Sequence, residues 1–342
     1  MLVLTDAARW HMMTGWLAFL GNYWAHAILV SLVSVVVVQG VARVWPTRSS
    51  NLSSRLAFLS VVLPPLAMAF YEIGFGGDSG LRQQVPLLRP NGWLYLTSGK
   101  FVWVVWVVVP LALLTVVPFA YEGVAGFIGP RRQRWKPTVD VELRSRGSAA
   151  SQSVGTAVGF SPRLMVVCRG EPVASVSGLL RPTIMLSEQL IRILDQEELE
   201  AVIAHECAHI KRHDTWVGYL AFLARALLLF NPAVTWAYWQ MSVHAERSCD
   251  RWAAERTGLH LALGSALLKI DRAANGRAPN LAEVVEDVRL SVRLWEGTAR
   301  RTLLRERVER LLHDCSSDSA GTVLPALTVA AAIVLVVLFF IG

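Results

Sequence analysis

The stretch VIAHECAHIKRH (Val202–His213) contains an HExxH motif formed by His205, Glu206 and His209. Residues four apart in a helix lie on the same face, so both imidazoles can reach one metal ion. Glu206 stands next to the first histidine and can act as a general base on a water molecule activated by the metal. The motif therefore predicts a helix that supplies two zinc ligands and a base. The alternative is two solvent-facing histidines on an amphipathic helix.

A catalytic zinc ion needs a third protein ligand and one open position. A histidine ten residues after the first would be one solution, but Thr215 stands there. Glu246 and Asp250, in the stretch HAERSCD (244–250), are again four residues apart. We interpret Glu246 as the third ligand and Asp250 as a carboxylate that accepts an N–H from a ligand histidine. The alternative is a row of charges on a helix surface.

Other polar side chains near these motifs have weaker signals. Three are candidates for stabilising the oxyanion of a transition state, namely Tyr238, His244 and Arg247. His213 and Asp214 are expected only to end the motif helix. Cys207 is expected in the core and Cys249 in packing near the site. The chain has four cysteines and no CxxC pair, so free thiols in a reducing compartment are expected.

Composition indicates a membrane protein with one attached soluble domain. Of the 342 residues, 54% are apolar and 17% are charged, whereas soluble domains carry about 25% charged residues. Long uncharged stretches predict four membrane spans, at about 17–40, 54–74, 101–122 and 319–342. The second stretch is short and contains two prolines, so a re-entrant or interfacial helix is its alternative. The predicted division is an N-terminal membrane region (1–130), a zinc domain (131–318) and a fourth membrane helix (319–342).

Basic residues predict the orientation of these spans. The net charge is +7, and arginines cluster after the third span and at 300–310, before the fourth. The zinc domain is therefore expected in the cytoplasm, with both termini outside. Because this charge flanks apolar runs, we expect no direct binding of nucleic acid. The apolar stretch 215–243 separates the proposed ligands and is too short to cross twice. It predicts a helical pair, broken near Asn231–Pro232, that does not cross.

Local patterns predict the remaining elements of the zinc domain. Short β-like runs occupy 163–168, 172–177 and 182–186, and the second is either a core strand or an edge strand that pairs with an extended peptide. Residues 147–161 are rich in Gly and Ser and predict a linker. Asp195 and Glu198 resemble a capping box at the start of the motif helix. Further helices are predicted at 258–273, 281–294 and 300–313.

Taken together, these motifs resemble the BlaR/MecR-type integral-membrane zinc metallopeptidases, a gluzincin family with the pattern HExxH and a later ExxxD. The resemblance rests on SGLLRPTIMLSEQL (177–190), EELEAVIAHECAHIKRHD (197–214) and ERSCD (246–250), and on the layout of spans. It implies a mainly α fold, in which multi-span membrane helices accompany a cytoplasmic α+β gluzincin-type domain with a small β-sheet. It implies one Zn²⁺ per chain and roles for five residues: ligands His205, His209 and Glu246, base Glu206, and supporting carboxylate Asp250.

The same resemblance implies a zinc endopeptidase of the bacterial plasma membrane that acts in regulated proteolysis or signal transduction. Sensing members carry a penicillin-binding domain after the fourth span, but this sequence has neither that domain nor an SxxK motif. We therefore expect no direct covalent sensing of β-lactams. The expected partners are a protein substrate (a repressor of the BlaI type, or the enzyme itself), the lipid bilayer and a second copy of the chain.

Two other functions stay open on the sequence alone. A quality-control or processing protease similar to the HtpX and CAAX-prenyl-protease group shares HExxH with a later ExxxD. A membrane scaffold or sensor without catalytic activity is the second alternative, although a purely structural metal site would not need Glu206.

Overall fold

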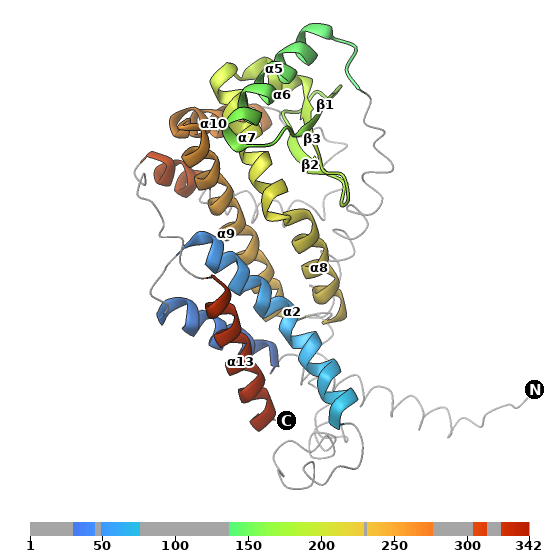
Figure 1. The fold of residues 1–342 in the computed structure, drawn as a ribbon, viewed down its shortest axis with the longest axis vertical. Helices are drawn as coiled ribbons and strands as arrows, with labels where there is room; N and C mark the ends of the chain where they lie inside the picture. Colours follow the sequence, from blue (N-terminus) through green and yellow to red (C-terminus); the bar gives the residue numbers. More distant parts are fainter. Residues whose placement is uncertain are drawn as a thin grey trace, which may run out of the picture. The chain divides into compact units, whose positions relative to one another are not determined.

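The computed structural model describes residues 30–44, 49–75, 137–228, 231–275, 304–312 and 323–341. These residues are mainly helical and include a three-stranded sheet, as predicted (Figure 1). The chain divides into two compact units. The first comprises Met1–Gly129, Tyr219–Ser242 and Ala320–Gly342, and the second comprises Pro130–Gly218 and Val243–Ser319. The second unit contains the HExxH motif and the ExxxD motif, so it holds the candidate site.

The sheet of the second unit has the strand order β1-β3-β2. Its central strand β3 (Thr183–Ser187) pairs in parallel with β1 (Arg163–Val167) and antiparallel with β2 (Ala174–Ser177). The three predicted strands are confirmed with small shifts at their ends, and β2 takes the edge position. At Gly178, in the turn after β2, a Cβ would lie 2.8 Å from the carbonyl oxygen of Arg181. Glycine is therefore required there, and its φ is +97°.

The linker predicted at 147–161 is wrong, because most of this segment belongs to helix α5 (Val141–Val158). A Cβ at Gly147 would lie only 3.3 Å from a methyl group of Val166, so the small residue lets the helix approach β1 closely. The apolar residues follow helical spacing, and the buried ones are Ala150, Val154 and Val158. The Gly and Ser content that is typical of linkers here serves close packing.

Helix α7 (Gln196–Arg212) carries the HExxH motif and follows the short helix α6 (Glu188–Ile193). The predicted capping box at its start is confirmed, because Asp195 and Glu198 each accept a hydrogen bond from the other's backbone N–H at 2.9 Å. Glu198 also accepts hydrogen bonds from side chains of α10 (His260–Asn275). These contacts fix the start of α7 against the core, two turns before the first motif histidine.

The predicted helical pair with a break near Asn231–Pro232 is confirmed as α8 (Asp214–Leu227) and α9 (Pro232–Thr257). The side-chain oxygen of Asn231 accepts hydrogen bonds from the first backbone N–H groups of α9 and caps that helix. The boundary between the two units falls inside both helices. The ExxxD half of α9 belongs to the second unit, together with α7.

The first unit contains α2 (Ser50–Phe75), which packs against α13 (Val323–Ile341), and a helical segment at 30–44. Its described core consists of Val38, Leu52, Leu56, Leu63, Ala326, Ala330 and Val334. Two buried polar contacts tie it together: Ser54 Oγ donates to the carbonyl oxygen of Met241 at 3.2 Å, and Asn231 Nδ2 donates to Ser31 Oγ at 2.8 Å.

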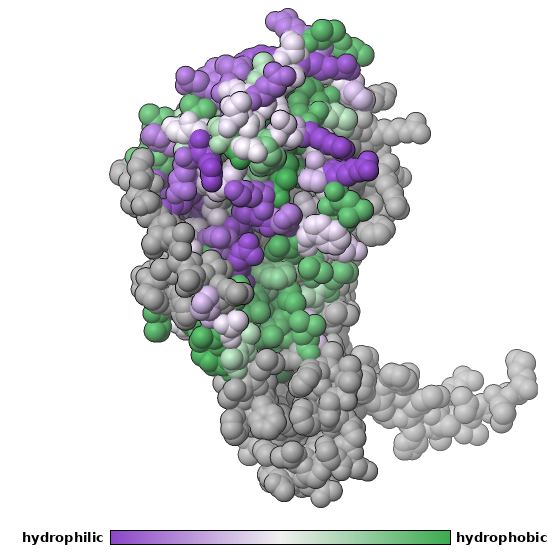
Figure 2. Space-filling model, in the orientation of Figure 1, coloured by the Kyte–Doolittle hydropathy of each residue, from purple (hydrophilic) through white to green (hydrophobic). Residues whose placement is uncertain are grey.

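Two of the predicted spans fall on described helices, 54–74 on α2 and most of 319–342 on α13. The span at 101–122, the start of the one at 17–40 and the helix predicted at 281–294 lie outside the described residues. Across the described ranges, no helix combines the length and the apolar composition that a bilayer crossing requires. On the face seen in Figure 2, hydrophilic side chains gather over the elements of the second unit.

Candidate metal centre

The two motif histidines converge at the C-terminal half of α7. Their Nε2 atoms lie 3.1 Å apart, and the ring centroids are separated by 4.8 Å in an edge-on arrangement. The spacing of four residues in a helix produces this geometry, because both side chains leave the same face one turn apart. His205 is buried, whereas His209 is partly exposed.

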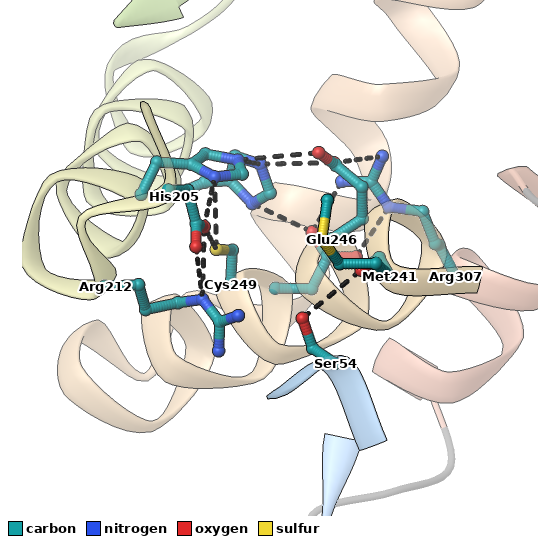
Figure 3. Close-up of polar contacts among 10 residues, drawn as sticks. Ser54, His205, Arg212, Met241, Glu246, Cys249 and Arg307 are labelled. Atoms are coloured by element: carbon teal, nitrogen blue, oxygen red, sulfur yellow. Dashed lines mark hydrogen bonds and ion pairs between the residues drawn. The ribbon is translucent and has the colours of Figure 1, made fainter. Parts of the chain in front are cut away.

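Glu246 of α9 faces both imidazoles (Figure 3). Its Oε1 lies 3.5 Å from Nε2 of His209, and its Oε2 lies 3.6 Å from Nε2 of His205. Tetrahedral zinc with bonds of about 2.0–2.1 Å keeps its ligand atoms about 3.3 Å apart. The structure thus brings the three predicted ligands together at separations that fit a zinc ion.

Each ligand histidine has a carboxylate behind its Nδ1 atom. For His205 this is Asp250, whose Oδ1 lies 3.0 Å from Nδ1, but the geometry does not form the hydrogen bond that the sequence predicts. For His209 it is Asp214, whose Oδ2 lies 2.8 Å from Nδ1. The prediction that Asp214 only ends the helix is therefore incomplete. His213 adopts a left-handed φ of 58°, and the sharp turn there brings Asp214 back toward His209.

Each of these carboxylates is in turn held by an arginine. Arg212 donates from Nε to both oxygens of Asp214, at 3.1 and 3.2 Å. Arg307, on the helical segment 304–312, donates from Nε and Nη2 to the two oxygens of Asp250, each at 2.6 Å. Sequence reasoning treated Arg307 only as part of a basic cluster. No short motif marks it, because 57 residues separate it from Asp250.

Burial and charge set the protonation states of the centre. Burial disfavours the imidazolium of His205, but the carboxylates of Asp250 and Glu246 raise its pKa to about 10. Burial would raise the pKa of Glu246, yet His205 and Arg307 hold that pKa far below its usual range. The surrounding carboxylates thus favour the protonated form of His205, and because a metal-binding imidazole is neutral, binding of an ion at these residues would be coupled to release of a proton.

Glu206 follows His205 directly on α7 and is 7% exposed. Burial raises the pKa of its carboxyl group, although the two ligand histidines oppose this shift. A carboxylate with a raised pKa accepts a proton more readily at neutral pH than an ordinary glutamate does. The environment of Glu206 thus suits a general base.

The three oxyanion candidates have other neighbours. Arg247 donates from Nη2 to Glu306 at 2.5 Å. The ring of Tyr238, in the first unit, lies under the guanidinium of Arg225 at 5.3 Å. Burial, and then the positive charge of Arg247, lower the pKa of His244 to about 4, so its imidazole is neutral at pH 7.

Cys249 lies behind the centre, with Sγ 3.4 Å from Nδ1 of His209 and 3.5 Å from Oδ2 of Asp214. These three groups are close enough to bind a metal ion themselves. Burial and the charge of Asp214 raise the pKa of Cys249 far above its usual range, so its thiol is neutral and a poor ligand. This agrees with the packing role expected from the sequence.

The three described thiols of the second unit, Cys168, Cys207 and Cys249, should differ sharply in reactivity. Burial raises the pKa of Cys207 to about 12, and that of Cys249 still further, whereas Cys168 is exposed. Only thiolates react with alkylating agents. Iodoacetamide at pH 8 should therefore modify Cys168 in the folded chain and spare the other two, as peptide mass spectrometry would show. Denatured protein is the control, in which all three should react. Equal labelling of Cys249 and Cys168 before denaturation would contradict the burial.

Comparisons with known proteins show which peptidase family the chain resembles. A family model described as BlaR1 peptidase M56 matches residues 100–294. A protease HtpX homolog from Pyrococcus furiosus is 29% identical over 151 residues, which cover 34% of this chain and 52% of the relative. The methicillin resistance mecR1 protein of Staphylococcus aureus is 29% identical over 96 residues, 28% of this chain and 16% of the relative.

Among solved structures, the crystal structure of S. mikatae Ste24p aligns at 16% identity and a TM-score of 0.32. That alignment covers 66% of this chain and 70% of Ste24p. The chain spans about half or less of the length of the two curated relatives.

Proposed function

The chain belongs to the BlaR1 peptidase M56 family, and from this membership and the geometry of the metal centre we propose that it is a membrane-embedded zinc endopeptidase. One observation carries the proposal: His205, His209 and Glu246 converge at separations of 3.1–3.6 Å beside the buried carboxyl group of Glu206. A scaffold or sensor without catalytic activity would need no acid–base group at that position.

The residues of the centre divide the chemistry between them. His205, His209 and Glu246 would hold the ion, which when bound acts as a Lewis acid and lowers the pKa of water toward about 7. Glu206 takes the proton from the attacking water and returns it to the leaving amine. Asp250 stands behind His205 with Oδ1 3.0 Å from Nδ1, a position from which its charge would favour the ring orientation that binding an ion requires.

The edge strand β2 supports binding of an extended peptide. β2 (Ala174–Ser177) pairs with β3 on one side, and no strand pairs with its other side within the described part of the chain. It also packs against α7, the helix that carries the motif. A substrate strand added at this edge would run beside the motif helix, held by backbone hydrogen bonds that do not depend on its sequence.

The proposed setting follows from the sequence and from the relatives. We place residues 131–318 in the cytoplasm of a bacterial cell, between the membrane region 1–130 and the helix 319–342. The substrate is then a cytoplasmic or membrane-proximal protein, such as a repressor of the BlaI type or the enzyme itself, in regulated proteolysis. The similarity to the mecR1 protein, a methicillin resistance protein, supports this setting.

A second function is favoured by the extent of the similarity. The match with the HtpX homolog extends over 151 residues, or 34% of this chain, and the match with the mecR1 protein extends over 96 residues, or 28% of this chain. This supports a protease that degrades or processes membrane proteins in quality control.

A comparison of cellular proteomes tests both functions. Cells that produce the native chain are compared with cells that produce Glu206→Gln, and intact proteins that accumulate only with the variant are identified by mass spectrometry. Regulated proteolysis predicts one or a few accumulated proteins, with a repressor among them. Quality control predicts many accumulated membrane proteins. Identical proteomes would contradict both proteolytic functions.

A further inference from the structure

Arg307 connects a separate helix to the metal centre. It lies on the helical segment 304–312, beyond the residues 100–294 that the family model matches. Its side chain is 18% exposed and reaches Asp250 through two hydrogen bonds of 2.6 Å. Its third nitrogen, Nη1, lies 3.1 Å from Oε2 of Glu246 (Figure 3). One guanidinium therefore contacts both acidic residues of the ExxxD motif.

These contacts fix the atoms that face the first ligand histidine. A bidentate arginine holds the plane of a carboxylate, because two parallel N–H groups engage its two oxygens. Asp250 Oδ1, which accepts one of these bonds, is the oxygen 3.0 Å from His205 Nδ1. Glu246 Oε2, which Nη1 contacts, is the oxygen 3.6 Å from His205 Nε2. Arg307 thus constrains both carboxylates that flank His205.

The negative charge of Asp250 also indicates that Arg307 is needed to hold this carboxylate in place. The Asp250 side chain is 6% exposed, and a buried carboxylate without a cationic partner is strongly unfavourable. Without Arg307, the Asp250 carboxylate would lose the two hydrogen bonds that fix its plane and would be free to turn toward water. Its Oδ1 would then no longer be fixed beside Nδ1 of His205.

A second arginine, Arg212, makes corresponding contacts at His209 and can be compared with Arg307. Arg212 holds Asp214, which stands behind His209, in the same order of arginine, aspartate and histidine. Arg212 lies on α7 itself, three residues after His209, so helix geometry alone places it. Arg307 comes from a distant part of the sequence and also contacts the third ligand, so its placement requires the helix 304–312 to be docked.

Other contacts dock this helix independently of Arg307. Glu306 accepts a hydrogen bond of 2.5 Å from Arg247 of α9. Leu311 is 7% exposed and belongs to the core cluster of the second unit. Removing the guanidinium of Arg307 therefore leaves contacts that keep the helix in place.

We propose that Arg307 is a positioning residue of the metal centre, which orients Asp250 and Glu246 so that His205 and Glu246 meet the same ion. This inference rests on the proposed function, since it takes His205 and Glu246 as metal ligands. It assigns the helix 304–312 to the site, although the family match ends before it.

Zinc affinity of the full-length chain, purified in detergent, tests the proposal through competition with a chromophoric chelator. Arg307→Ala should weaken zinc binding roughly 10–100-fold, the range for residues behind metal ligands. Arg307→Lys retains the charge but not the bidentate geometry, so it should recover part of the loss. Arg305→Ala, on the same helix with a side chain 81% exposed and paired with Glu309, should leave the affinity unchanged.

A double-mutant cycle separates positioning from a purely structural role. If Arg307 acts through Asp250, Arg307→Ala should cost clearly less zinc affinity in an Asp250→Asn background than in the native chain. Should Arg307→Ala fail to fold, the same cycle is run with Arg307→Lys. An unchanged affinity in Arg307→Ala, an equal loss in both backgrounds, or an equal loss in Arg305→Ala would each overturn the proposal. A native chain that binds no zinc would instead refute the proposed function, so the two failures are distinguishable.

Discussion

Glu206→Gln should abolish peptide-bond cleavage while the chain still binds one equivalent of zinc. Glutamine has nearly the shape of glutamate, so His205 and His209 keep their places on α7. It cannot take a proton from water, and loss of a general base lowers the rate by about 10²–10⁴-fold. The measurement pairs kcat on an unfolded protein substrate, such as casein, with the zinc content of the same preparation.

Glu197→Gln provides the matched control for this result. Glu197 lies on the same helix α7, is exposed, and stands in the first turn rather than beside a ligand. Its variant should keep native kcat and native zinc. Undiminished cleavage by Glu206→Gln would remove Glu206 from the reaction and favour a scaffold or sensor. Loss of zinc together with activity would show instead that the substitution disturbs the metal site.

Glu246→Ala should lose both zinc and activity. The substitution removes one of three ligands and leaves the Nη1 group of Arg307 without its carboxylate partner. The loss of zinc affinity should exceed the roughly 10–100-fold expected for a residue that only supports a ligand. Zinc retained after dialysis against a chelator, measured by elemental mass spectrometry, gives the result directly.

Glu255→Ala is the control on the same helix. Glu255 lies further along α9, is 53% exposed and pairs with Arg251, so its loss should leave zinc binding intact. Stoichiometric zinc in Glu246→Ala would show that the third ligand lies elsewhere, and the arrangement proposed for the centre would fail.

The parts of the fold that local patterns determine could be predicted from the sequence. The capping box at Asp195 and the break at Asn231–Pro232 follow from contacts between residues that are close in the chain. Glu246 could be predicted as the third ligand from the coordination chemistry of zinc, since a catalytic zinc ion bound by two histidines requires a third protein ligand. The structure brings this carboxylate to the two histidines.

What the sequence did not reveal depends on distant contacts or on unusual backbone geometry. Asp214 reaches His209 only because His213 adopts a left-handed conformation, which a non-glycine residue seldom does. Arg307 meets Asp250 only after the chain folds. Helix α5 has the composition of a linker, because glycine and serine residues serve close packing in one setting and flexibility in another.

The ligands of the centre stand on two long helices, α7 and α9, and none stands on a loop. Backbone that is already ordered by a hydrophobic core loses little further conformational entropy when an ion arrives. In small zinc modules the energy of metal binding is the energy of folding. In this chain the helices themselves place the proposed ligands, so we expect it to release and recapture an ion without unfolding.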